Sequence, residues 1–171
     1  MLGIAVACWI STSLLYGCKD DELKPATGID ATLYNMAKGT TGFTWYKKSA
    51  RFLNKGSKSG HPESYLRTRY NATAAAHLDS NGKVIAGTTF ANGSLIVKEL
   101  VNDTVNKIVS RYAILYKNPS DGNADANGWV WGYVTGSGDT KVSATEKGSG
   151  CIGCHSINGH INLTLMNYDH P

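Results

Sequence analysis

Alternation between apolar and polar side chains dominates the middle of the chain. Residues 65–70 place Leu66, Thr68 and Tyr70 on one side and two arginines on the other, as a half-buried strand does. Further runs rich in β-branched residues extend this pattern, and the predicted strands are 65–70, 94–101, 107–116 and 129–134. Asn-Gly pairs at 81–82 and 92–93 mark turns. Because short turns join antiparallel neighbours, the pattern predicts a mostly antiparallel sheet.

Helical periodicity precedes these strands. In residues 41–54 the apolar positions recur at helical spacing, and basic residues occupy the other side; the apolar positions are Phe43, Tyr46, Ala50 and Leu53. The stretch predicts an amphipathic helix that begins at Thr41 or Thr44. A sheet with flanking helices places the chain in the α+β class.

The N-terminal part of the chain has a different character. Residues 1–18 carry no charge and are mostly apolar, which is typical of a secretory signal peptide. They end in Leu-Tyr-Gly-Cys, similar to a bacterial lipobox, and this predicts that Cys18 carries lipid. An uncleaved membrane-spanning anchor is the alternative. Residues 19–41 are polar and contain Pro25 and two glycines, so we expect a flexible tether followed by one domain over 42–171.

A five-residue motif near the C-terminus carries the chemistry. Cys151-Ile152-Gly153-Cys154-His155 is the attachment signature of a c-type haem, in which Cys151 and Cys154 form thioethers and His155 is the proximal iron ligand. Small helical electron-transfer cytochromes place this motif near the N-terminus. Four-helix cytochromes place it near the C-terminus, but their central region has helical periodicity, which is not the pattern here. The combination predicts one covalent haem c on a sheet-rich domain.

In these features the sequence resembles the cytochrome P-460 and cytochrome c′-beta family. The resemblance runs from about Phe43 to His155, and its blocks are 89–100 (TFANGSLIVKEL), 127–133 (NGWVWGY) and the haem motif. It implies an antiparallel sheet with flanking helices, usually in a homodimer. It also implies a five-coordinate haem with an open axial face for a small ligand such as nitric oxide.

Two positions bear on enzymatic activity. By resemblance, Lys98 matches the lysine that is cross-linked to the haem in hydroxylamine-oxidising members of the family. On its own terms, alternation places Lys98 on the face of Ile96 and Leu100, where burial would lower the pKa of its ammonium group. The resemblance also implies a carboxylate proton relay on the following strand, but Ala113 falls at about that place. Enzymatic activity is therefore left open, with hydroxylamine oxidation as an alternative to ligand binding.

Several other residues are candidates for the open face of the haem. Phe90, Trp129 and Trp131 are candidates for an apolar wall, and we assign Phe90 and Trp131 to the cofactor site. Met166 or a histidine as sixth ligand would instead make the protein an electron-transfer cytochrome. The candidate histidines are His61, His77, His160 and His170, and for these and Met166 a surface or packing role is favoured.

Composition limits the partners and the compartment. The 171 residues carry 17 Lys and Arg against 13 Asp and Glu, a net charge of +4 without a polybasic run, so the charge pattern does not favour nucleic-acid binding. Covalent haem attachment and the signal peptide together predict an exported bacterial protein, periplasmic or at the cell surface. The expected partners are a small ligand at the iron, a second copy of the chain, a redox partner and the membrane that holds the lipid.

Overall fold

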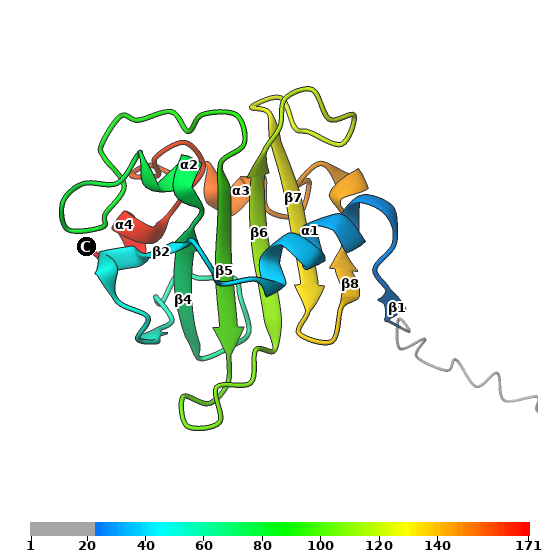
Figure 1. Ribbon diagram of the computed structural model, residues 1–171, viewed down its shortest axis with the longest axis horizontal. Coiled ribbons are helices and arrows are strands. Elements are labelled where there is room, and N and C mark those ends of the chain that lie inside the picture. Colours follow the sequence, from blue (N-terminus) through cyan, green and yellow to red (C-terminus); the bar gives the residue numbers. More distant parts are fainter. Residues whose placement is uncertain (1–22) are drawn as a thin grey trace, which may run out of the picture.

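The computed structural model describes residues 23–171, which form one antiparallel sheet with short helices on both faces (Figure 1). Along the main path the strand order is β1-β8-β7-β6-β5-β4-β2, and β3 also pairs with β4. The strands are β1 (Lys24–Pro25), β2 (Thr44–Trp45), β3 (Leu53–Asn54), β4 (Tyr65–Tyr70), β5 (Leu95–Val101), β6 (Arg111–Lys117), β7 (Trp129–Thr135) and β8 (Asp139–Val142). The helices are α1 (Gly28–Lys38), α2 (Ala72–Ala75), α3 (Ile152–His155), α4 (Met166–Asp169) and the 3₁₀ turns η1 (Tyr46–Lys48) and η2 (Ala144–Glu146).

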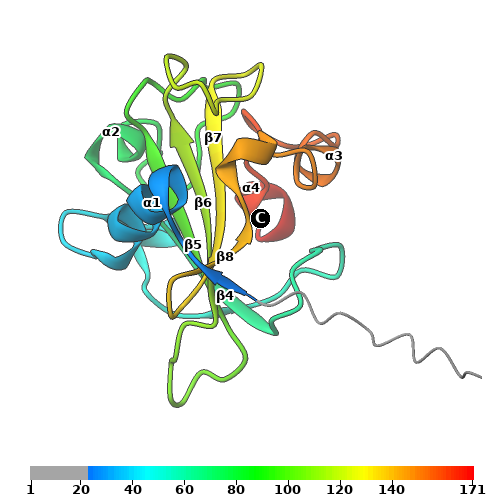
Figure 2. The ribbon, with the colours of Figure 1, turned by 90° about the vertical axis from the view of Figure 1, so that its right-hand side faces the viewer.

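The sheet has two different faces (Figure 2). On one face α1 packs over Leu95, Val97 and Ile114. On the other face Ile96, Leu100 and Leu115 meet the C-terminal segment, including Met166 of α4. The sequence therefore predicted correctly both the mostly antiparallel sheet and the side on which Ile96 and Leu100 lie, because alternation along each strand assigns its side chains to opposite faces.

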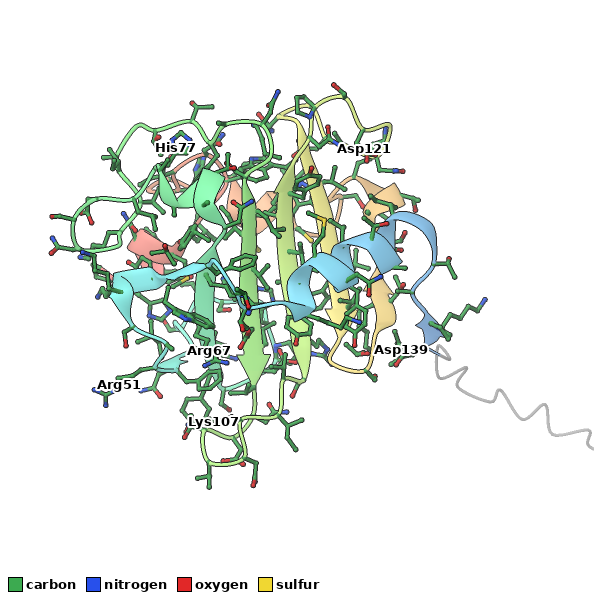
Figure 3. The ribbon with its side chains drawn as sticks, viewed as in Figure 1. Arg51, Arg67, His77, Lys107, Asp121 and Asp139 are labelled. Atoms are coloured by element: carbon green, nitrogen blue, oxygen red, sulfur yellow. The ribbon has the colours of Figure 1, made fainter. Side chains whose placement is uncertain are left out.

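One of the four long strands, β4, has the predicted bounds, and the other three lie within four residues of theirs. Loops at opposite ends of the sheet connect them, and Figure 3 shows Asp121 on the β6–β7 loop and Lys107 on the β5–β6 loop. The 107–116 strand begins later than expected, at Arg111, because Lys107 has a positive φ of 56° and belongs to the turn.

The helix predicted over residues 41–54 was wrong. The chain there forms β2, then η1, then β3. Lys47 and Lys48 have φ values of 50° and 52°, in the left-handed region, and an α-helix cannot continue through them. Tyr46 is nevertheless buried, 3% exposed. The sequence therefore predicted its apolar surroundings correctly but assigned it to the wrong secondary structure.

The flexible tether predicted over residues 19–41 was wrong for its second half. Residues 28–38 form α1, with Leu33 and Ala37 fully buried against the sheet. Asp30 accepts a hydrogen bond of 2.8 Å from the backbone N–H of Ala144, which fixes the start of the helix. The signal peptide, the lipobox with Cys18 and the first residues of the tether lie outside the described residues. Within residues 23–171, no helix has the length and apolar character needed to cross a membrane.

Candidate functional site

A cavity of about 450 Å³ lies between the sheet and the C-terminal segment. Neighbouring strands contribute a continuous row of side chains to its floor, because their positions are in register: Thr68 of β4, Lys98 of β5, Ala113 of β6, Tyr133 of β7 and Val142 of β8. Cys151, Cys154 and His155 line the same cavity. The volume lies within the range of small-molecule and cofactor sites.

The predicted haem-binding residues are brought together by α3. The two thiols are three residues apart on this single helical turn, and both are free. Burial raises the pKa of the Cys151 thiol, with smaller contributions from Glu146 and Cys154. His155 follows at the end of the turn, so all three chemical groups face one cavity from one short element.

The ring of His155 is fixed by two contacts. Its Nδ1 lies 2.8 Å from the carbonyl oxygen of Leu163, which makes Nδ1 the donor and leaves the lone pair on Nε2. The ring stands edge-on to Trp131, with centroids 5.1 Å apart at 88°. Burial, followed by the charge of Lys98, lowers the pKa of His155 to about 4, so the imidazole is neutral at physiological pH.

Trp131 also shapes the segment that leads into the motif. Its Nε1–H donates to Asp125 over 3.0 Å, which fixes the indole ring. Gly148 lies directly over this ring: a Cβ there would come within 2.6 Å of Trp131 Cδ1, and its φ is +73°. Only glycine allows the backbone to approach so closely in this conformation, so the motif is positioned by contact with Trp131.

Lys98 lies on the predicted face and lines the cavity. It is paired directly with Thr68 on one side and Ala113 on the other. Burial lowers the pKa of its ammonium group, and the charge of Asp169 acts in the opposite direction. Among the described residues that line the cavity there is neither an Asp nor a Glu, so the carboxylate expected by resemblance is not supplied from another element.

Two of the five candidates for the sixth ligand line the cavity, and the other three do not. Met166 lines the cavity, is 3% exposed, and its sulfur accepts a hydrogen bond of 3.1 Å from the Thr68 hydroxyl. His61 lines the cavity as well, whereas His77, His160 and His170 are not among its lining residues. In Figure 3, His77 lies beyond the sheet, near α2.

The two predicted aromatic site residues have different surroundings. Trp131 lines the cavity, but it stands edge-on to His155, beside the predicted proximal ligand, whereas the expectation was a wall of the open face. Phe90 does not line the cavity: it is 1% exposed, stacks on Tyr70 with centroids 6.4 Å apart and meets Trp129 edge-on. Phe90 therefore belongs to the core beside the site, and its assignment to the cofactor wall is corrected.

For His61 the sequence favoured a surface or packing role over that of a ligand, whereas the structure places it in the lining of the cavity. It lies in the loop between β3 and β4 and reaches the cavity beside Gly60 and Pro62. Burial, then the charges of Lys98, His155 and Arg111, lowers the pKa of His61 to about 3. No local pattern predicts this position, because it depends on how the loop folds over the sheet.

Comparison with known proteins finds no relative of this chain. No family model, no curated protein and no solved structure matches the chain.

Proposed function

We propose that the chain is an exported monohaem c-type cytochrome whose five-coordinate haem binds a small ligand such as nitric oxide. One observation carries the proposal: Cys151, Cys154 and His155 line a single cavity, and His155 presents a free Nε2 lone pair. Cys151 and Cys154 would hold the haem through thioethers, and His155 would be the proximal ligand. The haem, when bound, would supply a redox-active iron that can bind a small ligand.

The side chains around the cavity favour a small neutral ligand. Ile96, Leu115 and Trp131 provide apolar walls that exclude water. The Leu163 carbonyl holds His155 in one tautomer and one orientation. Lys98 is the cation closest to the middle of the floor, and burial favours its neutral form.

Hydroxylamine oxidation through a haem linked to Lys98 is the second candidate. Its supporting observation is the position of Lys98 in the cavity with a lowered pKa, which makes the amine more nucleophilic. Against it stands the pairing of Lys98 with Ala113, because none of the described residues that line the cavity is an Asp or a Glu that could accept a proton. Electron transfer with Met166 as sixth ligand is a third candidate, since this sulfur also lines the cavity.

Covalent attachment is tested first. Mass spectrometry of the purified protein should show one haem that survives denaturation. We expect Cys151→Ser and Cys154→Ser each to lose one thioether and the double variant to lose covalent haem altogether. Wild-type protein expressed with a haem-attachment system but carrying no haem would refute the proposal.

The spectrum of the ferrous protein separates the three candidates. High-spin bands that respond to carbon monoxide, unchanged in Lys98→Ala, support ligand binding. A strongly red-shifted Soret band that disappears in Lys98→Ala but persists in Lys141→Ala supports the cross-linked enzyme; Lys141 is a matched lysine of the cavity lining. Sharp low-spin bands without a response to carbon monoxide, converted to high spin by Met166→Leu, support the electron carrier.

Export, the lipid on Cys18 and the homodimer belong to the same proposal. Fatty-acid labelling of the full chain in a bacterial host should disappear in Cys18→Ser. Light scattering of the lipid-free domain should give the mass of a dimer, and a monomer mass would contradict that part.

A further inference from the structure

The loop that carries His61 is fastened to the sheet by charged contacts. Its two ends are joined by the Lys55 N–H, which donates to the Ser64 carbonyl over 2.8 Å. Glu63, 2% exposed, forms an ion pair of 2.7 Å with Arg111 of β6. Lys55 Nζ also donates to the His61 carbonyl over 3.1 Å. These contacts hold the backbone on both sides of His61, so its imidazole has a defined place at the cavity.

Tyr133 supports the ring of His61. The His61 Nδ1 lies 3.4 Å from the Tyr133 hydroxyl, and the two ring centroids are 5.5 Å apart. Arg111, which binds Glu63, also lies over the Tyr133 ring, 5.8 Å from its centroid. One cation thus fixes both the loop and the tyrosine that supports the histidine.

The rings of His61 and His155 pack against two side chains of the same strand, β7. Tyr133 supports His61, and Trp131 supports His155. Tyr133 and Trp131 are two residues apart on β7 and share a face, which separates them by roughly 7 Å. Two imidazoles therefore approach the same part of the cavity.

Both imidazoles are held through Nδ1. Within the described part of the chain, Nε2 has no hydrogen-bond partner in either ring. The Nδ1 partners differ in kind, however. A carbonyl can only accept, so His155 carries its proton on Nδ1, whereas a tyrosine hydroxyl can donate to Nδ1 of His61 and leave the proton on Nε2.

We propose that His61 is a hydrogen-bond donor to the ligand in the cavity, using its Nε2–H, and that Tyr133 is its positioning residue. This inference rests on the proposed function, because the ligand is the one that a haem held by Cys151, Cys154 and His155 would bind. It names the class of ligand: a small molecule or anion whose outer atom accepts a hydrogen bond, such as nitric oxide, carbon monoxide or azide.

Two probes test the donor in the haem-loaded protein. Infrared spectroscopy of the carbon monoxide complex should show a higher C–O stretching frequency in His61→Phe, because a donor polarises the bound molecule. Azide titration of the ferric protein should give a Kd about tenfold weaker in the same variant, the size expected for one lost hydrogen bond. His61→Gln keeps an N–H donor and should stay closer to wild type.

Tyr133→Phe tests the positioning role and should shift both readouts in the same direction by a smaller amount. The matched control is Tyr112→Phe, since Tyr112 lies on the opposite face of the sheet, against Tyr34 of α1. This control should leave the C–O frequency and the azide Kd unchanged.

Two outcomes overturn the inference while leaving the covalent haem in place. If His61→Phe matches wild type in both probes, His61 does not contact the ligand. If the ferrous wild type is low-spin and His61→Phe makes it high-spin, His61 is itself an iron ligand. Protein without haem, or low-spin bands that persist in His61→Phe, would instead show failure of the proposed function.

Discussion

At the scale of single residues, Tyr46 links the site to the rest of the chain. Its hydroxyl donates to the His170 carbonyl over 2.6 Å, although the two residues are far apart in sequence. Burial, together with the negative charge of Asp79, raises the pKa of Tyr46 to about 12. The neutral phenol therefore fastens the end of the C-terminal segment that covers the cavity.

This raised pKa predicts a loss of stability in alkaline solution. Between about pH 10, where an unfolded tyrosine ionises, and about pH 12, the unfolded state releases a proton that folded Tyr46 keeps. The free energy of unfolding should fall across this range by up to about 2 kcal/mol on account of Tyr46. Urea unfolding of wild type and Tyr46→Phe at several pH values measures the difference, which should shrink as the pH rises. A constant difference would contradict this assignment.

At the scale of elements, α1 is joined to the sheet by a buried charge cluster. Arg69, fully buried, pairs with Glu99 at 2.6 Å and also donates to the Ala37 carbonyl in the last turn of α1. Glu99 binds Arg67 at 2.6 Å with its other oxygen. A cation at the C-terminus of a helix is also favoured by the helix dipole.

Removing the shared carboxylate should be costly. Glu99→Ala leaves the Arg69 charge buried without its partner, and the expected loss is about 3–5 kcal/mol of unfolding free energy. Arg67→Ala is the control, because it removes the partly exposed member of the cluster and should cost about 1 kcal/mol. Chemical denaturation measures both, and equal losses would show that the Arg69–Glu99 pair adds nothing beyond the Arg67–Glu99 pair.

The backbone before the haem motif offers a second test at this scale. Gly148→Ala places a methyl group against the Trp131 ring at a positive φ, so we expect a loss of about 1–3 kcal/mol and incomplete haem attachment. Gly153→Ala is the matched control: a Cβ there meets nothing within 4 Å, and the residue does not have a positive φ. The ratio of haem to protein measures attachment. Equal ratios in the two variants would show that the contact between Gly148 and Trp131 does not position the motif.

The same elements indicate what the sequence could and could not predict. The long strands were predictable because alternation is a local property of each strand. The helix over 41–54 failed because apolar residues at helical spacing belong to separate short elements, with left-handed backbone between them. Helix α1 was missed because Pro25 and the flanking glycines concealed the spacing of Leu33 and Ala37. His61 carried no local signal, since long-range contacts such as the Glu63–Arg111 pair bring its loop to the cavity.

At the scale of the whole molecule, the cavity divides two structural parts. One is the sheet with α1, and the other is the C-terminal segment with α3 and α4 on the opposite face (Figure 2). Besides Tyr46, a few side chains join the parts: Asn162 accepts from the Phe90 N–H at 3.0 Å, and Asn167 donates to the Val84 carbonyl at 2.6 Å. The covalent haem would add a third layer between them.

In the Cys151→Ser and Cys154→Ser double variant, amide hydrogen exchange should accelerate in residues 151–171 and remain slow in β4–β7. The C-terminal segment loses packing when the cavity is unfilled, whereas the strands keep the hydrogen bonds between them. Haem-loaded wild type provides the reference, because a group bound only to the folded state stabilises that state. Acceleration spread evenly over the sheet would mean that the two parts unfold together. Unchanged exchange in residues 151–171 would mean that the segment does not depend on the haem.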